Sequence, residues 1–572
     1  MAKRYRPVNR DQPYLFPPSM RDWLPPEHPV WLVITAVEEH MDTSAFHAGR
    51  KLGGAGTAGY DPDMLVTVLV WAYAHQVTSS RDIERLCWTD VAFRVICGGN
   101  TPRHVTVAEF RRAFPGRIGA FFAEVLALCA RLGMGKLGVV ALDGMKIAAN
   151  ASKSANRTEE TLAKMAAQTV ARHGETDAAE DDLFGAGVAG DEVPEDAWSP
   201  RRRDQRVAAA LASLRAERQA AESERARKEQ EHLADAAAGA PRRGSPPAGA
   251  AVELAAMKVE RARAAQQAKV DAWDARAAAA GASGRKPRGP RPADPDSYVR
   301  VREARAELER AQARAEEARR KAAQKQKNRK GPGPVRNITD PDGRLMPVRG
   351  GGFIEGYNTQ NVTSADGLVI ATELTQDTTD APWFEPMLRQ AEDAAALITA
   401  HRPAASDPAA SASDPDASDG DASASLIRLF LSDAGYLSEH NLTIPGPDRL
   451  IATGKTRDIE KAARHSADGD TSDGVPRASP HIAAMAARLA TEDGIAAYRQ
   501  RGHIAETPHG NIKHNMRFRQ LSVRGKPKAA AEWTFTCAVH NLFKAITTGH
   551  LTTAALDRLA SQAGYPPPPQ AA

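Results

Sequence analysis

The order of hydrophobic and polar positions divides the chain into a helical first part, a strand-containing core and a charged segment that interrupts this core. Residues 31–132 repeat apolar positions at helical spacing, and Met64–Trp71 is apolar enough to predict a buried helix. Ser79 precedes a further helical pattern in the position of an N-cap, with Asp82 in the first turn. The pattern therefore predicts an all-α domain over residues 1–135.

Two short apolar runs predict buried strands, and each leads into an aspartate. Leu137–Leu142 has the length and β-branching of a buried strand and is followed by Asp143. Leu426–Leu431 has the same character and is followed, after one serine, by Asp433. If the two strands are neighbours in one sheet, both carboxylates emerge at the same edge of it.

The rest of the core pattern predicts further strands and helices. Phe353–Val362 and Leu368–Thr375 flank an Asp-Gly turn signal and predict a hairpin. Trp383–Thr399 is an amphipathic helix by its spacing, Arg449–Thr453 is a candidate short strand, and helical patterning covers 480–498 and the stretch to about residue 560. The predicted fold class is therefore α/β, with a mixed sheet.

A long charged segment separates the first core strand from the others. Residues 157–335 are rich in Ala, Arg, Glu, Gln and Lys, and Gly/Pro stretches interrupt them. Large apolar residues are too sparse for a good heptad seam, so we expect solvated helices or a weak helical hairpin over 206–236 and 298–327. Three acid–base pairs have the favourable i,i+4 order, namely Glu224/Lys228, Glu316/Arg320 and Glu317/Lys321.

These patterns give a predicted division of the chain. A Ser/Asp/Ala tract at 403–424 predicts a disordered loop. The predicted parts are a helical domain (1–135), the first part of the core (136–156), a helical or disordered insertion (157–335), core strands and a helix (336–402), the loop (403–424), the rest of the core (425–548) and a C-terminal tail (549–572).

Composition narrows the class of protein. Apolar residues make up 42% of the 572, below the usual ~45–50%, so part of the length is expected to be unpacked. The four cysteines form no Cys-x-x-Cys pair, which argues against a zinc ribbon or a disulfide scaffold. No signal peptide and no apolar run near the ~20 residues of a membrane span is present, so we expect a cytoplasmic protein without a membrane partner. The net charge of +5 is a weak bias.

The acidic residues suggest metal-dependent phosphoryl chemistry. Such sites need a few carboxylates that converge on two hard cations. Asp143 and Asp433 fit this requirement, and Glu506 is the best third candidate because it is the only acid among seven Lys/Arg between Arg501 and Lys528. On the residues alone, a strand-end Asp-Gly is more often a turn. Zinc is disfavoured, because the histidines around Glu506 do not share one helix face.

Three blocks of the chain resemble bacterial insertion-sequence transposases of the DDE type. The blocks are Tyr60–Leu65 continued by Ser79–Glu84, then Leu142–Ser152, and finally Ser432–Tyr436 together with Tyr498–Lys513. The likeness is greatest to the group numbered eleven-eighty-two, with an InsH-type N-terminal domain. It implies a ribonuclease-H-like catalytic core in which Asp143, Asp433 and Glu506 are catalytic and bind Mg²⁺ or Mn²⁺, as two ions.

The same resemblance implies which residues meet DNA. Tyr498, Arg501, Glu506 and Lys513 match a Tyr-Arg-Glu-Lys signature, although four residues rather than three separate Arg501 from Glu506. The predicted DNA-binding residues are Tyr498, Arg501, Lys513, Arg517 and Arg519, with Arg81, Arg111 and Arg112 in the helical domain. Predicted partners are double-stranded DNA, as terminal inverted repeats and target, and a second copy of the chain when two ends are paired. The predicted protein is bacterial and associates with the nucleoid when bound.

Three functions remain open at this point. The first is a transposase that cleaves element ends and joins them to a target. The second is a catalytically decayed or repurposed relative that only binds DNA. The third is a ribonuclease-H-like nuclease without strand transfer. The presence of all three acids favours the first.

Overall fold

The computed structural model describes residues 19–48, 59–168, 200–238, 246–282, 286, 289–327, 334–348, 351–403, 426–454 and 479–562. The chain falls into two compact units, Met1–Ala155 with Asn337–Ala572 (unit 1) and Asn156–Arg336 (unit 2). The predicted disordered loop lies outside the described residues except for its first position, as does the end of the predicted tail. Within the described ranges, no helix is long and apolar enough to cross a membrane.

The first part of unit 1 is helical, as the spacing of apolar residues predicted. Asp61 caps α3 by accepting a hydrogen bond from Asp63 N, and Pro62 occupies the first turn, where its missing N–H has no consequence. Ser79 caps α4 as expected. The helices are η1 (Met20–Asp22), α1 (Pro29–Glu39), α2 (Ser44–His47), α3 (Pro62–Ala74), α4 (Ser80–Thr89), α5 (Val91–Ile96), α6 (His104–Arg112) and α7 (Ile118–Arg131).

These helices share one hydrophobic core with the sheet that follows. Helices α3 and α7 pack against α18 (Lys526–Thr547) near the end of the chain. Phe121 of α7 stacks on Phe535 of α18, and Tyr73 of α3 meets the same ring edge-on. The helical part is therefore joined to the core within one compact unit, and the two share a continuous apolar interior.

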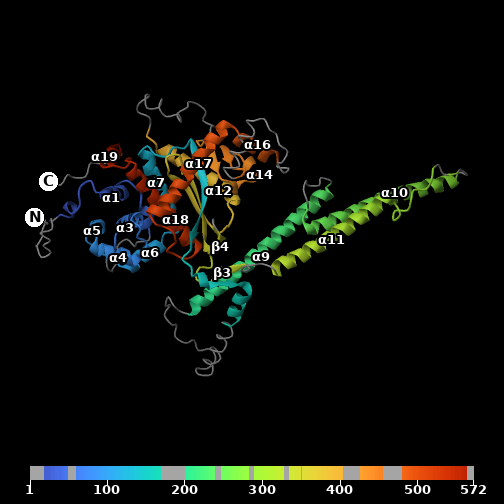
Figure 1. The fold of residues 1–572 in the computed structure, drawn as a ribbon, viewed down its shortest axis with the longest axis horizontal. Helices are drawn as coiled ribbons and strands as arrows, with labels where there is room; N and C mark the ends of the chain where they lie inside the picture. The colour runs from blue at the N-terminus through green and yellow to red at the C-terminus, as the bar shows by residue number, and fades with distance from the viewer. Residues whose placement is uncertain are drawn as a thin grey trace, which may run out of the picture. The chain divides into compact units, whose positions relative to one another are not determined.

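The core is a mixed sheet (Figure 1). Its path is β4-β5-β1-β7-β8, and β6 pairs with the part of β5 that β4 does not cover. Strands β1, β7 and β8 are parallel, whereas β5 is antiparallel to β1, β4 and β6. The strands are β1 (Val139–Ala148), β4 (Arg344–Pro347), β5 (Phe353–Ser364), β6 (Val369–Thr375), β7 (Leu429–Ser432) and β8 (Asp448–Ile451).

Strand β1 is longer than its apolar run predicted. It continues through Asp143 to Ala148, because β5 pairs with it over that whole length. The parallel pairing with β7 stops at Leu142, so Asp143 lies where β1 loses one neighbour while keeping the other. The prediction that Asp143 marks the end of the strand was therefore wrong.

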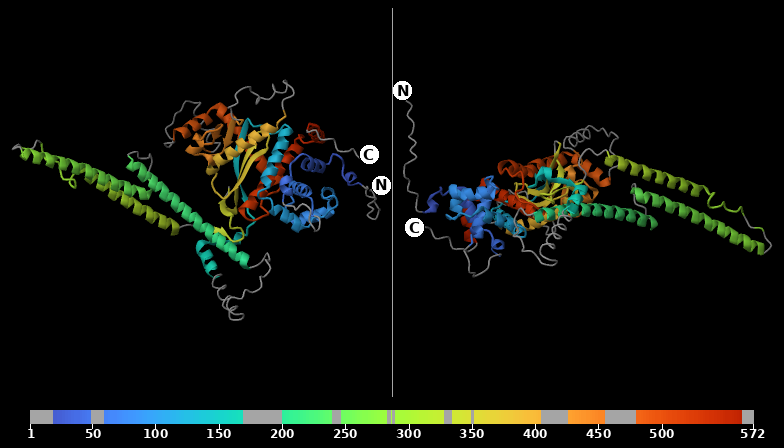
Figure 2. Two further views of the ribbon diagram at one scale, coloured as in Figure 1. Left: turned by 180° about the vertical axis from the view of Figure 1, so that it is seen from behind. Right: turned by 90° about the horizontal axis from the view of Figure 1, so that it is seen from below.

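Helices cover both faces of the sheet (Figure 2). Ala141 belongs to a hydrophobic cluster with residues of α16 and α17, whereas Val140 and Leu142 belong to the larger core. This alternation follows from the two-residue period of a strand. The helices of this region are α12 (Phe384–His401), α14 (Glu439–Thr443), α16 (Pro480–Leu489), α17 (Glu492–Gly510), α18 and α19 (Thr553–Gln562), with short 3₁₀ turns η3 (Ala381–Trp383) and η4 (Ala434–Tyr436).

Helix α17 carries Arg501 and Glu506, at the start of the basic segment singled out by the sequence. It runs through Pro508, which has no N–H to donate, and then passes into a π-helical segment η5 (Asn511–Asn515). Glu506 and Lys513 therefore lie on one continuous helical stretch whose geometry changes between them. Isolated π-helical turns of this kind are frequent at functional sites.

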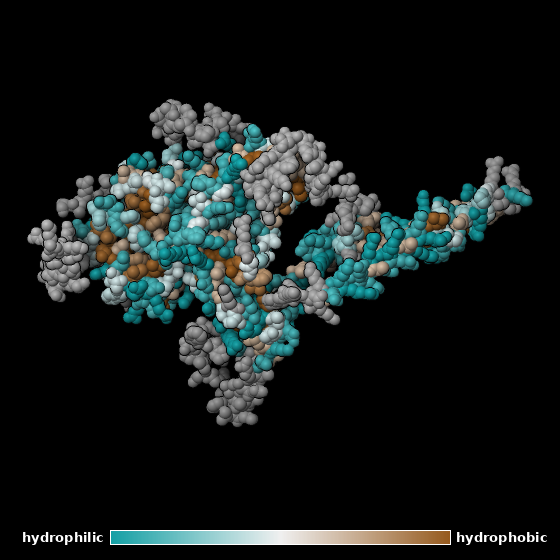
Figure 3. All heavy atoms as spheres, in the orientation of Figure 1, coloured by the Kyte–Doolittle hydropathy of each residue, from teal (hydrophilic) through white to brown (hydrophobic). Residues whose placement is uncertain are grey.

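Unit 2 consists largely of long helices. They are α9 (Pro200–Ala237), α10 (Ala248–Ala282) and α11 (Val299–Lys327), and α10 packs along both others. The described side chains on their surface are mostly hydrophilic (Figure 3). All three predicted i,i+4 ion pairs form, with N–O distances of 2.6 to 3.6 Å. Two short strands, β2 (Asn156–Thr158) and β3 (Val335–Asn337), pair where the chain enters and leaves this unit.

Candidate active site

Asp143 and Asp433 lie side by side on neighbouring strands. The parallel register pairs Leu142 with Ser432, and each aspartate follows its partner by one residue. The side chain of Asp143 is 17% exposed and that of Asp433 is 41% exposed. The sheet therefore brings together two carboxylates that are far apart in sequence, at the edge that the apolar runs predicted.

A guanidinium lies between these two carboxylates. Arg501 of α17 donates a hydrogen bond from Nη2 to Asp143 Oδ1 over 3.0 Å, and the same nitrogen lies 3.8 Å from Asp433 Oδ2. The Arg501 side chain is only 13% exposed, and its Nε atom is buried without a partner in the described part of the chain. One cationic group is thus shared by both acids.

His509 is a neighbour that the sequence did not assign to the acids. It is eight residues beyond Arg501, about two helical turns, so both side chains point from α17 toward β1. Its Nδ1 lies 3.8 Å from Asp143 Oδ2, and its Nε2 is buried with no partner among the described residues. The helical spacing from Arg501 was the available sequence signal, but the nearby histidines were weighed only as zinc ligands.

The two aspartates have opposite pKa shifts. Burial by itself raises the pKa of Asp143, but His509 and Arg501 outweigh that effect, and the net pKa is lowered. Burial raises the pKa of Asp433, and the negative charge of Asp143 adds to this, while Arg501 acts against it. Two neighbouring carboxylates with one shared cation behave in this way, because the second negative charge is compensated less well.

Glu506 is not in contact with the other two acids. It lies on α17 between Arg501 and His509, and it is exposed. Within the described ranges it makes no hydrogen bond or ion pair, so its carboxylate is available to a ligand. The structure therefore brings two members of the predicted triad together and places the third on the helix that covers them.

The remaining signature residues differ in their surroundings. Tyr498 of α17 is 7% exposed and packs in the hydrophobic cluster that α16 and α17 form with the sheet. Burial raises the pKa of its hydroxyl. Lys513 is half-buried on η5, and burial, followed by Arg519, lowers its pKa. Tyr498 is therefore placed to position α17, whereas Lys513 is partly open to a ligand.

The predicted basic residues other than Arg501 and Lys513 separate into an exposed group and one buried residue. The exposed residues are Arg81, Arg112, Arg517 and Arg519. Arg111, by contrast, has a side chain that is 9% exposed, and it donates hydrogen bonds to the Tyr73 hydroxyl, Thr78 O, Ser80 Oγ and Ser522 Oγ. It also lies 3.9 Å from Glu532 Oε1. Arg111 joins the helical part to the core, and we do not retain it as a DNA contact.

A further carboxylate, Asp380, was missed by the sequence reasoning. It lies between β6 and η3, and its Oδ1 accepts hydrogen bonds from Asn358 Nδ2 (2.7 Å) and Gln360 Nε2 (2.8 Å) on β5. Its charge contributes to the raised pKa of Asp433. No apolar strand leads directly into Asp380, so the pattern that revealed Asp143 and Asp433 did not apply to it.

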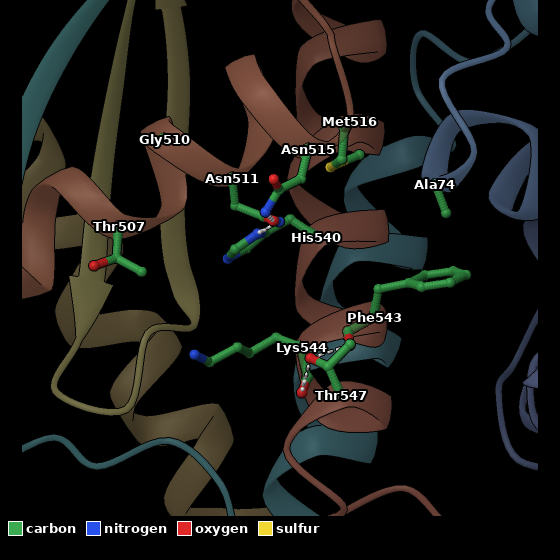
Figure 4. A pocket seen from close by; sticks show the side chains of 10 residues that line it. All are labelled: Ala74, Thr507, Gly510, Asn511, Asn515, Met516, His540, Phe543, Lys544 and Thr547. Atoms are coloured by element: carbon green, nitrogen blue, oxygen red, sulfur yellow. Dashed lines mark hydrogen bonds between the residues drawn. The ribbon is translucent and has the colours of Figure 1, made fainter.

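A pocket of about 440 Å³ lies beside η5 and is lined by Asn511 and Asn515 of that segment (Figure 4). Asn511 and His540 point toward each other in it, and Asn511 Nδ2 lies 2.9 Å from His540 Nδ1. Thr507 and Lys544 also line it. None of the aspartates described above borders this pocket, so it is separate from the acid cluster.

The donor set suits a hard divalent cation. Asp143 and Asp433 offer carboxylate oxygens, the ligands that Mg²⁺ and Mn²⁺ prefer. The position of Arg501 between them shows that both carboxylates can share a single positive charge. Within the described residues the one compact group of three potential metal ligands is His47, Asp61 and Asp63, which are largely exposed.

Two models of known protein families match parts of the chain. A family model described as Transposase domain (DUF772) matches residues 18–113, which hold the first helices. A second, described as Transposase DDE domain, matches residues 468–546, which include Arg501, Glu506 and Lys513. No curated protein and no solved structure matches the chain.

Together, the two matches support a DDE transposase, and more particularly one of the insertion-sequence type. The matches do not distinguish groups of insertion sequences, so the eleven-eighty-two likeness remains a prediction.

Proposed function

We propose that this transposase cleaves DNA at the ends of its insertion sequence and joins those ends to a target, using divalent cations bound by Asp143 and Asp433. The observation that carries this proposal is the shared guanidinium between the two aspartates at the edge of the parallel strands. DDE transposase domains generally use divalent metal ions. The order β6-β5-β1-β7-β8, with β5 antiparallel, supports a ribonuclease-H-like core.

The site residues divide the chemistry between them. Asp143 and Asp433 would hold the cations, and Glu506 would add a ligand from α17. Bound cations would activate the attacking hydroxyl and stabilise the leaving oxygen of an in-line displacement. Water as the attacking group would nick the element end, and a DNA 3′-hydroxyl would join it to the target.

Arg501 has two successive roles in this proposal. Without DNA it neutralises Asp143 and Asp433, as observed. When a cation takes over that neutralisation, the guanidinium is free to hold a phosphate oxygen with its paired N–H donors. Lys513 would supply a second positive charge, and Tyr498 would fix the position of the helix.

The exposed arginines provide a surface for the DNA backbone. Arg517 and Arg519 follow η5 directly, and Arg81 and Arg112 lie on the helical part of unit 1. Contacts of this kind depend steeply on salt, because binding releases counterions. The pairing of two ends implies two copies of the chain in the DNA complex.

The test is cleavage of labelled DNA that carries the element's own terminal repeats, with Mg²⁺ or Mn²⁺. We expect nicking at the element boundary, loss of nicking in Asp433→Ala, and retention of end binding in that variant. Asp393→Ala, which removes an exposed acid of α12, is the matched control and should cleave normally. Specific end binding without cleavage in every protein would instead indicate a transposase that only binds DNA, and cleavage without joined products would indicate a nuclease.

A further inference from the structure

The positive charge of this protein is concentrated in the segment that interrupts its core. Residues 200–336, from the first residue of α9 to the end of unit 2, contain 33 of the 76 Lys/Arg but only 18 of the 71 Asp/Glu. Their net charge is therefore +15, whereas the whole chain carries +5 and the other residues together carry −10. The weak bias of the whole chain thus hides a strongly basic segment.

Helix α11 has the largest excess of positive charge among the helices of this segment. It contains ten Lys/Arg and five Asp/Glu. Three of the five acids already form ion pairs with basic side chains of α10 or of α11 itself, namely Glu307, Glu316 and Glu317. Five exposed arginines of α11 have no acidic partner among the described residues, namely Arg300, Arg302, Arg310, Arg314 and Arg319.

The apolar side of α11 is occupied by α10, which leaves the arginines to the solvent. Small and apolar residues recur along α11 at spacings of three and four, and each is buried or half-buried, namely Val301, Ala304, Leu308, Ala311 and Ala315. Arg310 and Arg314 are one turn apart and therefore point to the same side of the helix. At about 1.5 Å per residue, α11 extends over roughly 43 Å, the length of about 13 base pairs of duplex DNA.

The surface of unit 2 does not suit a protein partner or single-stranded DNA. Among its described residues, Val299 is the one large apolar side chain that is exposed, whereas the centre of a protein interface is apolar and poor in charge. Its described aromatic rings are engaged within the unit, since Trp273 donates to Gly289 O and Tyr298 faces the Lys269 ammonium. Stacking of unpaired bases needs free aromatic rings. Unpaired arginines on a hydrophilic helix instead fit the phosphates of a duplex.

We propose that α11 is a second DNA-binding surface of this protein, whose unpaired arginines contact the phosphates of duplex DNA without reading base sequence. This inference rests on the proposed function, because it takes DNA as the substrate. It extends that function to unit 2, whereas the DNA-binding residues predicted from the sequence all lie in unit 1. The charged insertion then increases the affinity of the transposase for any duplex long enough to reach α11.

The test measures binding of the full chain to duplex DNA by fluorescence anisotropy at several salt concentrations, with and without terminal repeats in the duplex. Arg310→Gln/Arg314→Gln removes two charges and keeps good helix formers. We expect affinity at 0.1 M salt to fall about 10-fold or more, and the slope of log K against log salt to flatten by up to about 1.8 units. Both effects should be the same with and without the repeats. Arg310→Lys/Arg314→Lys should retain most of the binding, because a phosphate contact needs the charge.

The matched control is Glu316→Gln/Arg320→Gln, which removes an ion pair from the same helix without changing its net charge. This variant should bind DNA like the parent, and circular dichroism would show that every variant keeps its helices. Equal affinity and salt dependence for the parent and Arg310→Gln/Arg314→Gln would overturn the inference. Weaker self-association of Arg310→Gln/Arg314→Gln in sedimentation, with unchanged DNA binding, would also overturn it and assign α11 to contact with a second copy.

Cleavage at element ends separates this inference from the proposed function. A parent chain that cleaves end DNA but has the same salt dependence as Arg310→Gln/Arg314→Gln would contradict the inference alone. A parent chain that loses affinity in Arg310→Gln/Arg314→Gln as expected, yet cleaves no end DNA with Mg²⁺ or Mn²⁺, would contradict the proposed function and support the inference.

Discussion

Arg501 Nη2 lies 3.0 Å from Asp143 Oδ1, although 358 positions separate the two residues in the chain. The contact joins the helix matched by the DDE family model to the strand that carries the first acid. Because Asp433 is close to the same nitrogen, the guanidinium acts in this structure as the counter-charge of the acid pair.

Removal of that counter-charge gives the first prediction. Arg501→Ala leaves two close carboxylates without compensation, so we expect the metal-free protein to lose about 2 to 3 kcal/mol of unfolding free energy. Mn²⁺ should then raise the melting temperature by more than it does in the parent, since it binds only the folded pair. Thermal unfolding with and without Mn²⁺ measures both effects. Arg517→Ala, which removes an exposed arginine, should behave like the parent in both conditions.

The Glu506 side chain gives a prediction that separates an effect on DNA cleavage from an effect on folding stability and end binding. Because Glu506 is exposed and makes no polar contact within the described chain, Glu506→Gln should leave stability and end binding unchanged. Cleavage should nevertheless fall at least about 100-fold, as when one group that stabilises a transition state is removed. Parallel unfolding, binding and cleavage assays check this. Normal cleavage by Glu506→Gln would remove Glu506 from the proposed triad.

The neighbours Arg111 and Arg112 provide a matched pair. Arg111→Met leaves Glu532 buried without its cation, so we expect a loss of about 3 kcal/mol or more in unfolding free energy. Arg112→Met removes an exposed charge, so stability should change by less than about 0.5 kcal/mol. Urea unfolding measures both.

For DNA binding, the effects of the two substitutions should be reversed, so that Arg112→Met has the larger effect. Arg112→Met should weaken binding to element ends, and the dependence of log K on log salt should flatten by about one unit. Arg111→Met, assayed where it is still folded, should keep the parent's salt dependence. A flatter slope for Arg111→Met alone would show that Arg111 reaches DNA after all.

His540 predicts how stability depends on pH. Burial lowers its pKa to about 4, from an ordinary value of about 6.5 in the unfolded chain. The unfolded chain therefore takes up the proton first, and His540 should remove about 3 kcal/mol of stability as pH falls from 6.5 to 4. Unfolding at several pH values should show a shallower loss for His540→Gln than for the parent. The exposed His550→Gln is the control and should keep the parent's slope.

Much of the fold could be predicted from local patterning. The hairpin of β5 and β6, helix α12 and the three ion pairs of unit 2 formed where spacing predicted them. These features depend on residues close in sequence, so periodicity and turn chemistry suffice. The length of β1 could not be predicted, because its second half is held by pairing with β5 rather than by its own apolar residues.

The site was predictable only in part, for the same reason. Asp143 and Asp433 were found because each follows an apolar run that buries a strand. Asp380 and His509 became site residues through contacts with β5 and β1, which no spacing in their own segments reveals. Arg111 shows the opposite case, since an arginine at the end of a polar helix is buried by a partner 421 positions further along the chain.

The sequence by itself determined the class of elements, the two aspartates that follow apolar runs, the lone glutamate in a basic segment and the likeness to DDE transposases. These are properties of residue type and short-range order. Only the tertiary structure decided that Arg501 neutralises the acid pair, that Glu506 stands apart from it and that Asp380 accepts two amide groups of β5. Those relationships depend on strand register and helix packing, which bring distant residues within a few ångströms and which local patterns do not specify.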